Sequence, residues 1–190
     1  GKVTIQGLDV REESTRRRIG ILGHGISLYD ELSAFENLTI FAKLYGLTGP
    51  VQRAEEMLVR VGLERVRDGL VREFSRGMRQ RLAVARAFLH DPEVLLLDEP
   101  FTALDDRAIA VLQSLLAEMH GRGRTIVMST HQLREALELA THVALLQRGH
   151  ELGQQLAQVL GQFADAFGLV GVNRVMAQDV AIVFHRDATA

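Results

Sequence analysis

Cysteine is missing from this sequence of 190 residues. Its absence excludes a disulfide framework and a thiolate metal site, and it favours a reducing, cytosolic location. The sequence also lacks an uninterrupted apolar run of the ~18 to 20 residues that a membrane-spanning helix requires. We therefore expect a protein that reaches a membrane only through a partner.

A concentrated positive charge is missing as well. The formal net charge is -2 and the isoelectric point is about 6.4, with the arginines scattered among acidic residues. Domains that bind nucleic acid usually carry a basic excess, so we expect no nucleic-acid partner. The sequence does have 47% hydrophobic residues, which is enough for the core of one globular domain.

Apolar runs bounded by turn residues alternate with longer segments of helical spacing, which is the pattern of parallel strands joined by crossover helices. The pattern predicts strands at residues 3–6, 18–22, 94–98, 125–129 and 143–147, and helices at 75–89 and 107–119. Residues 32–74 contain two helical stretches, which we interpret as an inserted helical subdomain. We expect an α/β domain over residues 1–149 and a tail over 150–190, in which 151–167 is helical in pattern and 179–185 is strand-like.

Two acids follow a buried strand in VLLLDEPFTALDD, residues 94–106. Ligands of open α/β sheets bind at the carboxyl ends of the strands, where Asp98 and Glu99 stand. Two carboxylates at such an edge can divide the work of holding Mg²⁺ and orienting a water molecule. Taken alone, an acid pair of this kind is more often an ordinary polar strand end, so its meaning depends on the surrounding motifs.

The longer stretch FSRGMRQRLAVARAFLHDPEVLLLDEPFTALDD, residues 74–106, resembles the ATP-binding subunits of ABC (ATP-binding cassette) transporters. Its parts stand in the family's order: the signature at 74–78, the Walker B strand ending at Asp98 and Glu99, the D-loop at 102–105, and the switch-histidine loop at 129–131. Several motifs in one order are far more specific than a single pattern. The resemblance implies a P-loop NTPase-like fold, with a mostly parallel sheet and an inserted helical subdomain.

The resemblance also implies roles. Asp98 would hold Mg²⁺ through water, Glu99 would orient or deprotonate the attacking water, and His131 would contact the γ-phosphate of ATP. The signature and the D-loop would bind the ATP held by a second ATP-binding subunit, in a head-to-tail dimer. On physical grounds Ser75 is a good N-cap, and Gly77 lets a phosphate approach the backbone closely. The candidates for this surface are Ser75, Arg76, Gly77, Met78 and Asp105.

Two positions depart from the family pattern. The usual signature reads Leu-Ser-Gly-Gly-Gln, whereas this sequence has Phe74, Arg76 and Met78; Arg76 offers a phosphate charge-assisted hydrogen bonds in place of the lost glycine. His24 replaces the glutamine of the Q-loop and is a candidate contact for both metal and nucleotide. The region with His24, LYDEL at 28–32 and ENL at 36–38 looks most like the ATP-binding subunit of the haem exporter of cytochrome c maturation. Drug and polysaccharide exporters have similar sequences.

A P-loop of the form GxxxxGK[ST] is absent, because neither Lys2 nor Lys43 has the required surroundings. The resemblance implies that the P-loop, its strand and an adenine-stacking aromatic precede Gly1. Losing about four charge-assisted hydrogen bonds costs at least ~6 kcal/mol, or about four orders of magnitude in affinity. We expect residues 1–190 to bind ATP weakly by themselves and not to hydrolyse it.

Three functions are compatible with these motifs. The first is an ATPase subunit that drives export through a transmembrane subunit, on the cytoplasmic face of the inner membrane. The second is a non-hydrolysing subunit that only completes a partner's ATP site, although such subunits usually lose the equivalents of Glu99 or His131. The third, a cassette ATPase of DNA repair or translation, fits less well, because repair versions place a long coiled coil where residues 32–74 stand. Candidates for the surface near a membrane subunit, or else for the subdomain core, are Phe35, Phe41, Leu44 and Tyr45.

Overall fold

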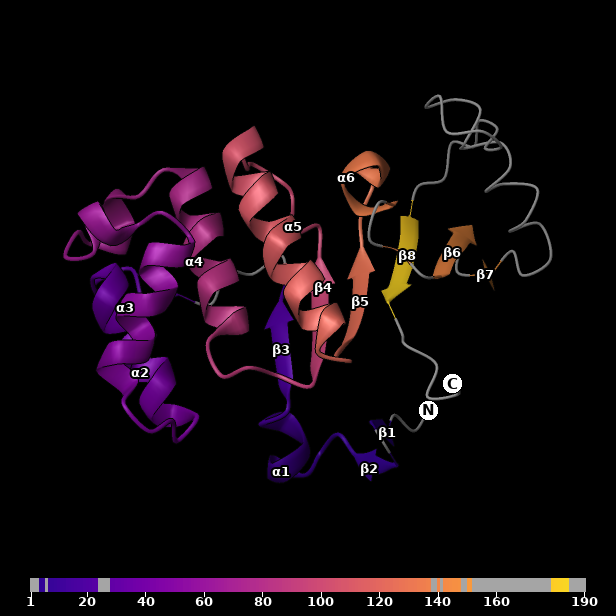
Figure 1. Cartoon of the computed structure of the whole chain (residues 1–190), viewed down its shortest axis with the longest axis horizontal. Coiled ribbons are helices and arrows are strands. Elements are labelled where there is room, and N and C mark those ends of the chain that lie inside the picture. The colour runs from indigo at the N-terminus through magenta and orange to yellow at the C-terminus, as the bar shows by residue number, and fades with distance from the viewer. Residues whose placement is uncertain are drawn as a thin grey trace.

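The computed structural model describes residues 4–5, 7–23, 28–137, 140, 142–147, 150–151 and 179–184. A six-stranded sheet runs through this part of the chain in the order β3-β4-β5-β8-β6-β7 (Figure 1). Its strands are β3 (Ile19–Leu22), β4 (Val94–Asp98), β5 (Thr125–Ser129), β6 (His142–Gln147), β7 (His150–Glu151) and β8 (Asp179–Phe184).

Strands β3, β4 and β5 form the parallel part of the sheet that the apolar runs predict. Leu95 pairs with Ile126, and Asp98 at the end of β4 pairs with Ser129 at the end of β5. Leu95 and Ile126 are fully buried because helices cover their face of the sheet. The carboxyl ends of these strands therefore lie at one edge, which is where the polar residues after β4 and β5 meet.

Strand β8 lies between β5 and β6 and is antiparallel to both. Strand β6 consequently runs in the same direction as β3, β4 and β5, so most strands of the sheet share one direction, and β8 and β7 run opposite to them. The sequence predicts a strand at residues 179–185 but does not indicate that this strand lies between β5 and β6. Strand order depends on pairing between distant segments, which local alternation does not encode.

The first predicted strand differs from the expectation. Strand β1 (Thr4–Ile5) pairs only with β2 (Leu8–Asp9), as a separate two-stranded antiparallel sheet. Gly7, between the two strands, has a φ of 80°, a left-handed conformation that suits a tight hairpin turn. The chain reverses direction there, and β1 and β2 are not part of the six-stranded sheet.

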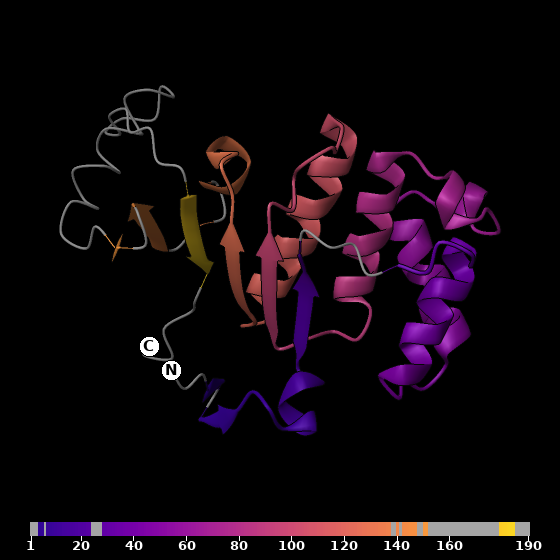
Figure 2. The same cartoon turned by 180° about the vertical axis from the view of Figure 1, so that it is seen from behind.

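Helices α4 (Arg76–Phe88) and α5 (Asp106–Gly121) lie on one face of the sheet. The view from behind shows β3, β4 and β5 without a helix over them in the described part of the chain (Figure 2). Two short helices, α1 (Glu13–Arg16) and α6 (Leu133–Leu137), precede β3 and follow β5. None of the helices in the described ranges has both the length and the apolar character needed to cross a bilayer.

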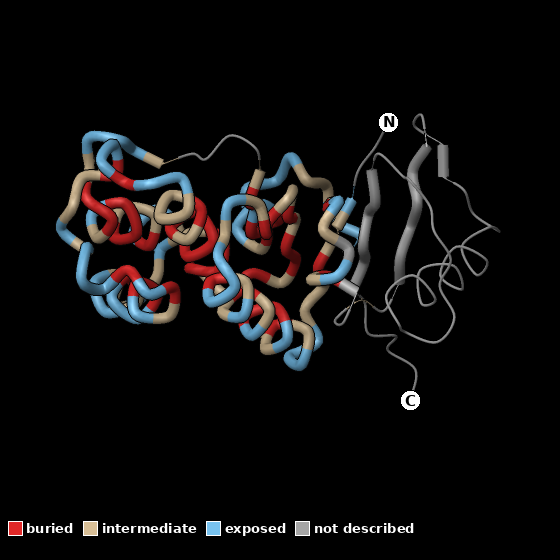
Figure 3. The backbone as a smooth tube through the Cα atoms, turned by 90° about the horizontal axis from the view of Figure 1, so that it is seen from above, coloured by how far each residue is buried: buried red, intermediate tan, exposed pale blue. Residues whose placement is uncertain are grey.

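Residues 34–73, all of which the structure describes, fold as helices without a strand. They comprise α2 (Ala34–Leu44), α3 (Pro50–Arg60) and the 3₁₀ turns η1 (Glu64–Val66) and η2 (Val71–Glu73). Ser33 and Glu36 form a capping box at the start of α2. Buried residues line the interior where these helices meet α4 (Figure 3). The helical stretches are as predicted, and the division of the chain into 1–149 and 150–190 stays a prediction.

A stacked pair of rings joins the end of α2 to the sheet. The rings of Tyr45 and His90 lie 3.7 Å apart between centroids, with an interplanar angle of 8°. His90 Nε2 donates to the carbonyl oxygen of Ile19 (3.1 Å), while His90 Nδ1 is buried without a hydrogen-bond partner. Burial lowers the pKa of His90 to about 4, so the ring is neutral near pH 7.

Candidate functional site

The acid pair lies at the carboxyl edge of the sheet, as predicted. Asp98 is the last residue of β4, and its Oδ1 accepts a hydrogen bond of 2.5 Å from the hydroxyl of Ser129. This contact follows from the register, which places the two residues opposite each other at the strand ends. The next residue, Glu99, begins the loop.

Glu99 has a backbone conformation that costs energy. Its φ is 46°, a left-handed value that residues other than glycine rarely adopt. The backbone N–H of Glu99 donates to the carbonyl of Ser129 (2.9 Å), and the carbonyl of Glu99 accepts from Thr102 N (3.2 Å). Strained residues of this kind concentrate at functional sites. In this loop the strain turns the Glu99 carboxylate toward the segment that follows β5.

That segment supplies donors to both carboxylate oxygens of Glu99. Oε1 accepts from the backbone N–H of His131 (3.0 Å) and lies 2.8 Å from His131 Nδ1. Oε2 accepts from the hydroxyl of Thr130 (3.3 Å). The side chain of Glu99 is 22% exposed, whereas that of His131 is 62% exposed. The structure therefore brings the two predicted catalytic residues into contact, with the histidine on the solvent side.

The oxygen ligands at this edge fit a magnesium ion bound together with a phosphate. In the described residues, no group of three or more histidine, aspartate or glutamate side chains is placed to hold a metal by itself. Mg²⁺ usually takes one or two carboxylates and completes its shell with water and substrate phosphates. Asp98 can supply the carboxylate. His24, the other predicted metal ligand, lies outside the described residues.

The signature residues form a second group, at the start of α4. Ser75 is the N-cap of this helix, and its Oγ accepts from Met78 N (3.2 Å). Arg76, the first residue of α4, is exposed. A Cβ built on Gly77 would lie 3.0 Å from the carbonyl oxygen of Ala103. Close packing on the loop after β4 is thus a reason for glycine at this position, besides the predicted approach of a phosphate.

Asp105 joins this second group and not the first. It is the N-cap of α5, where its Oδ1 accepts from Ala108 N (2.8 Å). With Ser75, Gly77 and Met78 it lines a hollow of about 260 Å³. Four of the five residues predicted for the signature surface therefore line one hollow. The fifth, Arg76, stands between two of them, Ser75 and Gly77, in the sequence.

The loop of residues 100–104 connects the two groups. Phe101 anchors it in the core with 1% exposure. The buried side chain of Gln80 on α4 donates from Nε2 to the carbonyl oxygen of Pro100 (3.1 Å). Gln80 is not among the residues predicted from the sequence, and Thr130 was predicted only as part of a motif, without a contact of its own. The two adjacent hydroxyl residues at the end of β5, Ser129 and Thr130, are the sequence feature that could have indicated this contact.

A family model described as ABC transporter matches residues 1–102, which is more than half of the 190 residues. The chain belongs to the ABC transporter family. The family predicted from the signature, Walker B and switch-histidine motifs is therefore confirmed, and so is the fold class. One solved structure, an ATP-binding subunit of an ABC transporter, superimposes with a TM-score of 0.73 at 29% identity over 90% of this chain and 72% of that chain.

Curated relatives of this ABC chain are named as ATP-binding proteins. It is 35% identical to the ABC transporter ATP-binding protein NatA of Bacillus subtilis, over 78% of this chain and 63% of that protein. It is 36% identical to the daunorubicin resistance ATP-binding protein DrrA3 of Streptomyces coeruleorubidus, over 84% of this chain and 52% of that protein. The Nod factor export ATP-binding protein I of Cupriavidus metallidurans is 35% identical, with 76% of this chain and 48% of that protein covered. The chain thus spans about half to two thirds of these relatives.

A second solved structure is a dimer of the ATP-binding cassette MJ0796 in a post-hydrolysis state with ADP and Pi. It superimposes with a TM-score of 0.64 at 28% identity, over 72% of this chain and 65% of that chain. The names of the three curated relatives include an exporter of Nod factor, and none of the three is named as a haem exporter.

Proposed function

We propose that this ABC chain is part of an ATP-hydrolysing subunit that drives export through a membrane partner. The observation that carries the proposal is the Glu99 carboxylate, held at the sheet edge beside Asp98 by donors from Thr130 and His131. A carboxylate fixed at the carboxyl end of a strand, next to a second carboxylate, suits a site that activates water beside a phosphate.

Glu99 orients the attacking water in this mechanism, and it accepts a proton from the water as the water oxygen bonds to the γ-phosphorus. The bond from that phosphorus to the β–γ bridging oxygen breaks, and ADP leaves. Its position does not depend on the nucleotide, because the donors come from the protein. Nδ1 of His131 contacts Glu99, and Nε2 is the ring nitrogen that contacts the γ-phosphate. Nε2 donates to the phosphate when the ring carries both protons. The exposed position of His131 keeps that nitrogen accessible.

Asp98 would hold Mg²⁺ through water, and the ion would neutralise charge on the β- and γ-phosphates of ATP. The hydrogen bond from Ser129 fixes one oxygen of Asp98. His24 is proposed as a further contact to the metal and the nucleotide, from its sequence position alone.

The signature group supports a head-to-tail dimer. Ser75, Gly77, Met78 and Asp105 line a hollow that is separate from the contacts of Glu99 and His131. The N-terminus of the 13-residue helix α4 opens beside it, and such ends favour phosphate. We propose that the hollow receives the γ-phosphate of ATP bound to a second subunit, and that Arg76 adds a charged contact.

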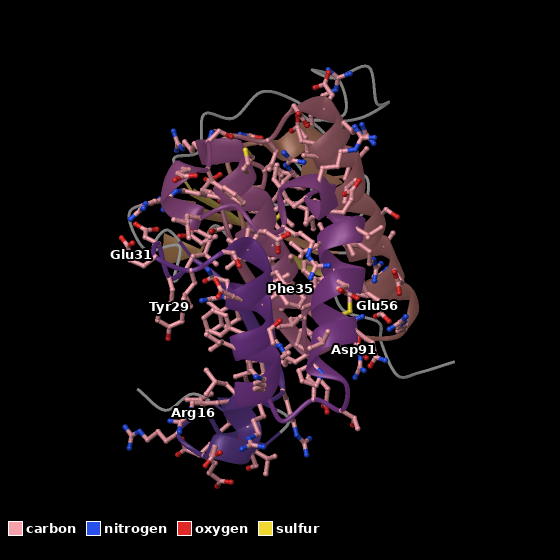
Figure 4. The ribbon with its side chains drawn as sticks, turned by 90° about the vertical axis from the view of Figure 1, so that its left-hand side faces the viewer. Arg16, Tyr29, Glu31, Phe35, Glu56 and Asp91 are labelled. Carbon is pink, nitrogen blue, oxygen red and sulfur yellow. The ribbon has the colours of Figure 1, made fainter. Side chains whose placement is uncertain are left out.

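A surface on α2 and the preceding loop is proposed to contact the transmembrane subunit. Tyr29 is 50% exposed and stacks on Phe41, and Leu44 is 64% exposed. Figure 4 shows Tyr29 at the outer edge of the molecule, whereas Phe35 lies between α2 and α3. Phe35 and Phe41 pack against the core, and Tyr45 stacks on His90. Of the four residues predicted for this surface, Leu44 is the exposed one. We add Tyr29 to the proposed surface.

We propose that the chain is a peripheral subunit at the cytoplasmic face of the inner membrane. The proposed substrate class is one that is exported, as the names of the Nod factor relatives suggest. Haem export for cytochrome c maturation is proposed from the sequence around His24 alone. Transport assays with haem and with a hydrophobic drug, in vesicles that contain the membrane partner, distinguish the two substrates.

ATP hydrolysis by the complete protein that carries these residues tests the proposed function. We expect phosphate release that requires Mg²⁺ and rises with the square of protein concentration where the dimer is sparse. Tight Mg²⁺-ATP binding without phosphate release would contradict the proposal. That outcome would favour the non-hydrolysing subunit, which only completes the site of a partner.

A further inference from the structure

Thr130 carries a hydroxyl group that is buried beside the Glu99 carboxylate. The residue is 1% exposed, so its hydroxyl has no access to bulk water. Its Oγ1 donates to Glu99 Oε2 (3.3 Å) and accepts from the backbone N–H of Gln132 (3.0 Å). A buried hydroxyl costs free energy unless it is hydrogen-bonded. The contact with Gln132 fixes the oxygen, and the hydroxyl proton is directed at Glu99.

The two oxygens of Glu99 are held unequally. Oε1 meets both the backbone N–H and Nδ1 of His131, whereas Oε2 meets the Thr130 hydroxyl. An ionised carboxylate oxygen has about two lone-pair sites. Oε2 therefore keeps a site for a water molecule, while Oε1 is occupied by the histidine. The terminal torsion of a glutamate is broad, so a donor on Oε2 is needed to define the direction of that site.

We propose that Thr130 is a positioning residue for hydrolysis, whose hydroxyl sets the orientation of Glu99 Oε2 toward the attacking water. The inference rests on the proposed ATPase function. Thr130 is buried and acts through Glu99, so it affects the chemical step and not the binding of nucleotide. Neither the signature surface nor the metal site depends on it.

Kinetics with matched variants of the complete protein test this role. Thr130→Val removes the hydroxyl at nearly constant volume, and Thr130→Ser retains it. We expect Thr130→Val to lower kcat by roughly tenfold to a hundredfold, the range of one hydrogen bond to a charged group, with KM for ATP unchanged. Thr130→Ser should restore most of kcat. A wild-type kcat in Thr130→Val, or a loss that Thr130→Ser does not reverse, would overturn the proposal.

Thr39 provides the matched control. It is also a buried threonine, on α2, but its hydroxyl has no hydrogen-bond partner. Thr39→Val makes the same chemical change away from the site and should leave kcat and KM unchanged. An equal loss of kcat in both valine variants would attribute the effect to general packing and reject the role of Thr130.

A double-mutant cycle on the 190-residue chain itself does not depend on hydrolysis. With Glu99 present, Thr130→Val should raise the unfolding equilibrium constant roughly tenfold, since it removes a charged hydrogen bond. In a Glu99→Ala background the hydroxyl has already lost its carboxylate acceptor, so the same change should destabilise less, through the loss of the Gln132 N–H contact alone. Equal effects in both backgrounds would disprove the contact. If the wild-type protein does not hydrolyse ATP, the proposed function fails, and the cycle still decides whether Thr130 holds Glu99.

Discussion

Gly77 packs directly on the backbone of Ala103, so that the first turn of α4 touches the loop between β4 and α5. A Cβ at position 77 would lie 3.0 Å from the Ala103 carbonyl oxygen. Ala103 itself has a φ of 63°, and Leu104 N donates to Phe101 O in the same loop (3.2 Å). The obstructing atom therefore belongs to a constrained backbone, and it cannot move away as a flexible side chain would.

Gly77→Ala is predicted to destabilise the fold by about 1 to 3 kcal/mol, as overpacking does, despite the better helix propensity of alanine. It should also lower ATP hydrolysis, because it displaces the loop that begins at Glu99. Gly121→Ala, at the end of α5, is the control, since a Cβ there meets nothing within 4 Å. Urea denaturation of both variants measures the difference, and equal midpoints would contradict the prediction.

In the complete protein, Glu99→Gln should reduce ATP hydrolysis by at least about a hundredfold, as the loss of a general base does. The amide keeps the shape of the side chain, so ATP binding and ATP-bound dimers should persist. Phosphate release and equilibrium binding of labelled ATP check the two parts. Glu93→Gln is a control outside the site, where the carboxylate forms a long ion pair of 3.6 Å with Arg18. Unchanged hydrolysis in Glu99→Gln would remove Glu99 from its role.

Stability should fall between pH 6.5 and about 4 because of His90. Burial lowers the pKa of His90 from 6.5 to about 4 in the folded chain. Over this interval the unfolded chain binds the proton and the folded chain does not, so acid favours unfolding. The contribution is fully present above pH 6.5 and diminishes toward pH 4, by on the order of 3 kcal/mol at most.

His90→Phe tests that prediction, since phenylalanine preserves a ring against Tyr45 but does not titrate. The free energy of unfolding, measured by urea denaturation at several pH values, should show a smaller slope between pH 4 and 6.5 in this variant. If the slopes of wild type and variant coincide, another group causes the acid sensitivity.

Gln80→Leu should destabilise the protein by about 1 to 3 kcal/mol, because it removes the buried donor to the Pro100 carbonyl. The change should also loosen the loop next to Glu99 and lower hydrolysis. Gln113→Leu is the matched control: the Gln113 amide also donates to one carbonyl, that of Glu135, but lies only partly buried and away from the loop. Similar activity in the two variants would show that Gln80 does not support the site.

Much of the fold follows from local patterns. Strands β4 and β5 have the predicted bounds, because parallel strands buried among helices are continuous apolar runs. Helix α4 begins directly after the N-cap predicted at Ser75. The position of β8 in the strand order could not be predicted, because the residues of a strand do not by themselves determine which strands it pairs with. The strand predicted at residues 3–6 was assigned to the wrong sheet for the same reason, because its described residues, Thr4 and Ile5, pair within a hairpin.

The site was predictable in its chemistry and less so in its contacts. The acids after β4 and the histidine after β5 were identified from motifs, and the structure brings Glu99 and His131 together. The contacts of Thr130 and Gln80 arise from strand register and helix packing, which no short pattern contains. Asp105 was predicted as a contact of the nucleotide, and the structure shows a contact that was not predicted: its carboxylate caps α5.

The register of β4 and β5 also constrains how this protein can be recombined with its relatives. Asp98 faces Ser129 because the two strands align residue by residue, and a slip of one residue would send each side chain to the other face. A crossover that changes the length of either strand therefore shifts Asp98 relative to Ser129. The turn at residues 122–124, between α5 and β5, tolerates a junction, because it leaves the length of both strands unchanged. Chimeras joined there should keep the site intact, whereas single-residue insertions within 94–98 or 125–129 should not.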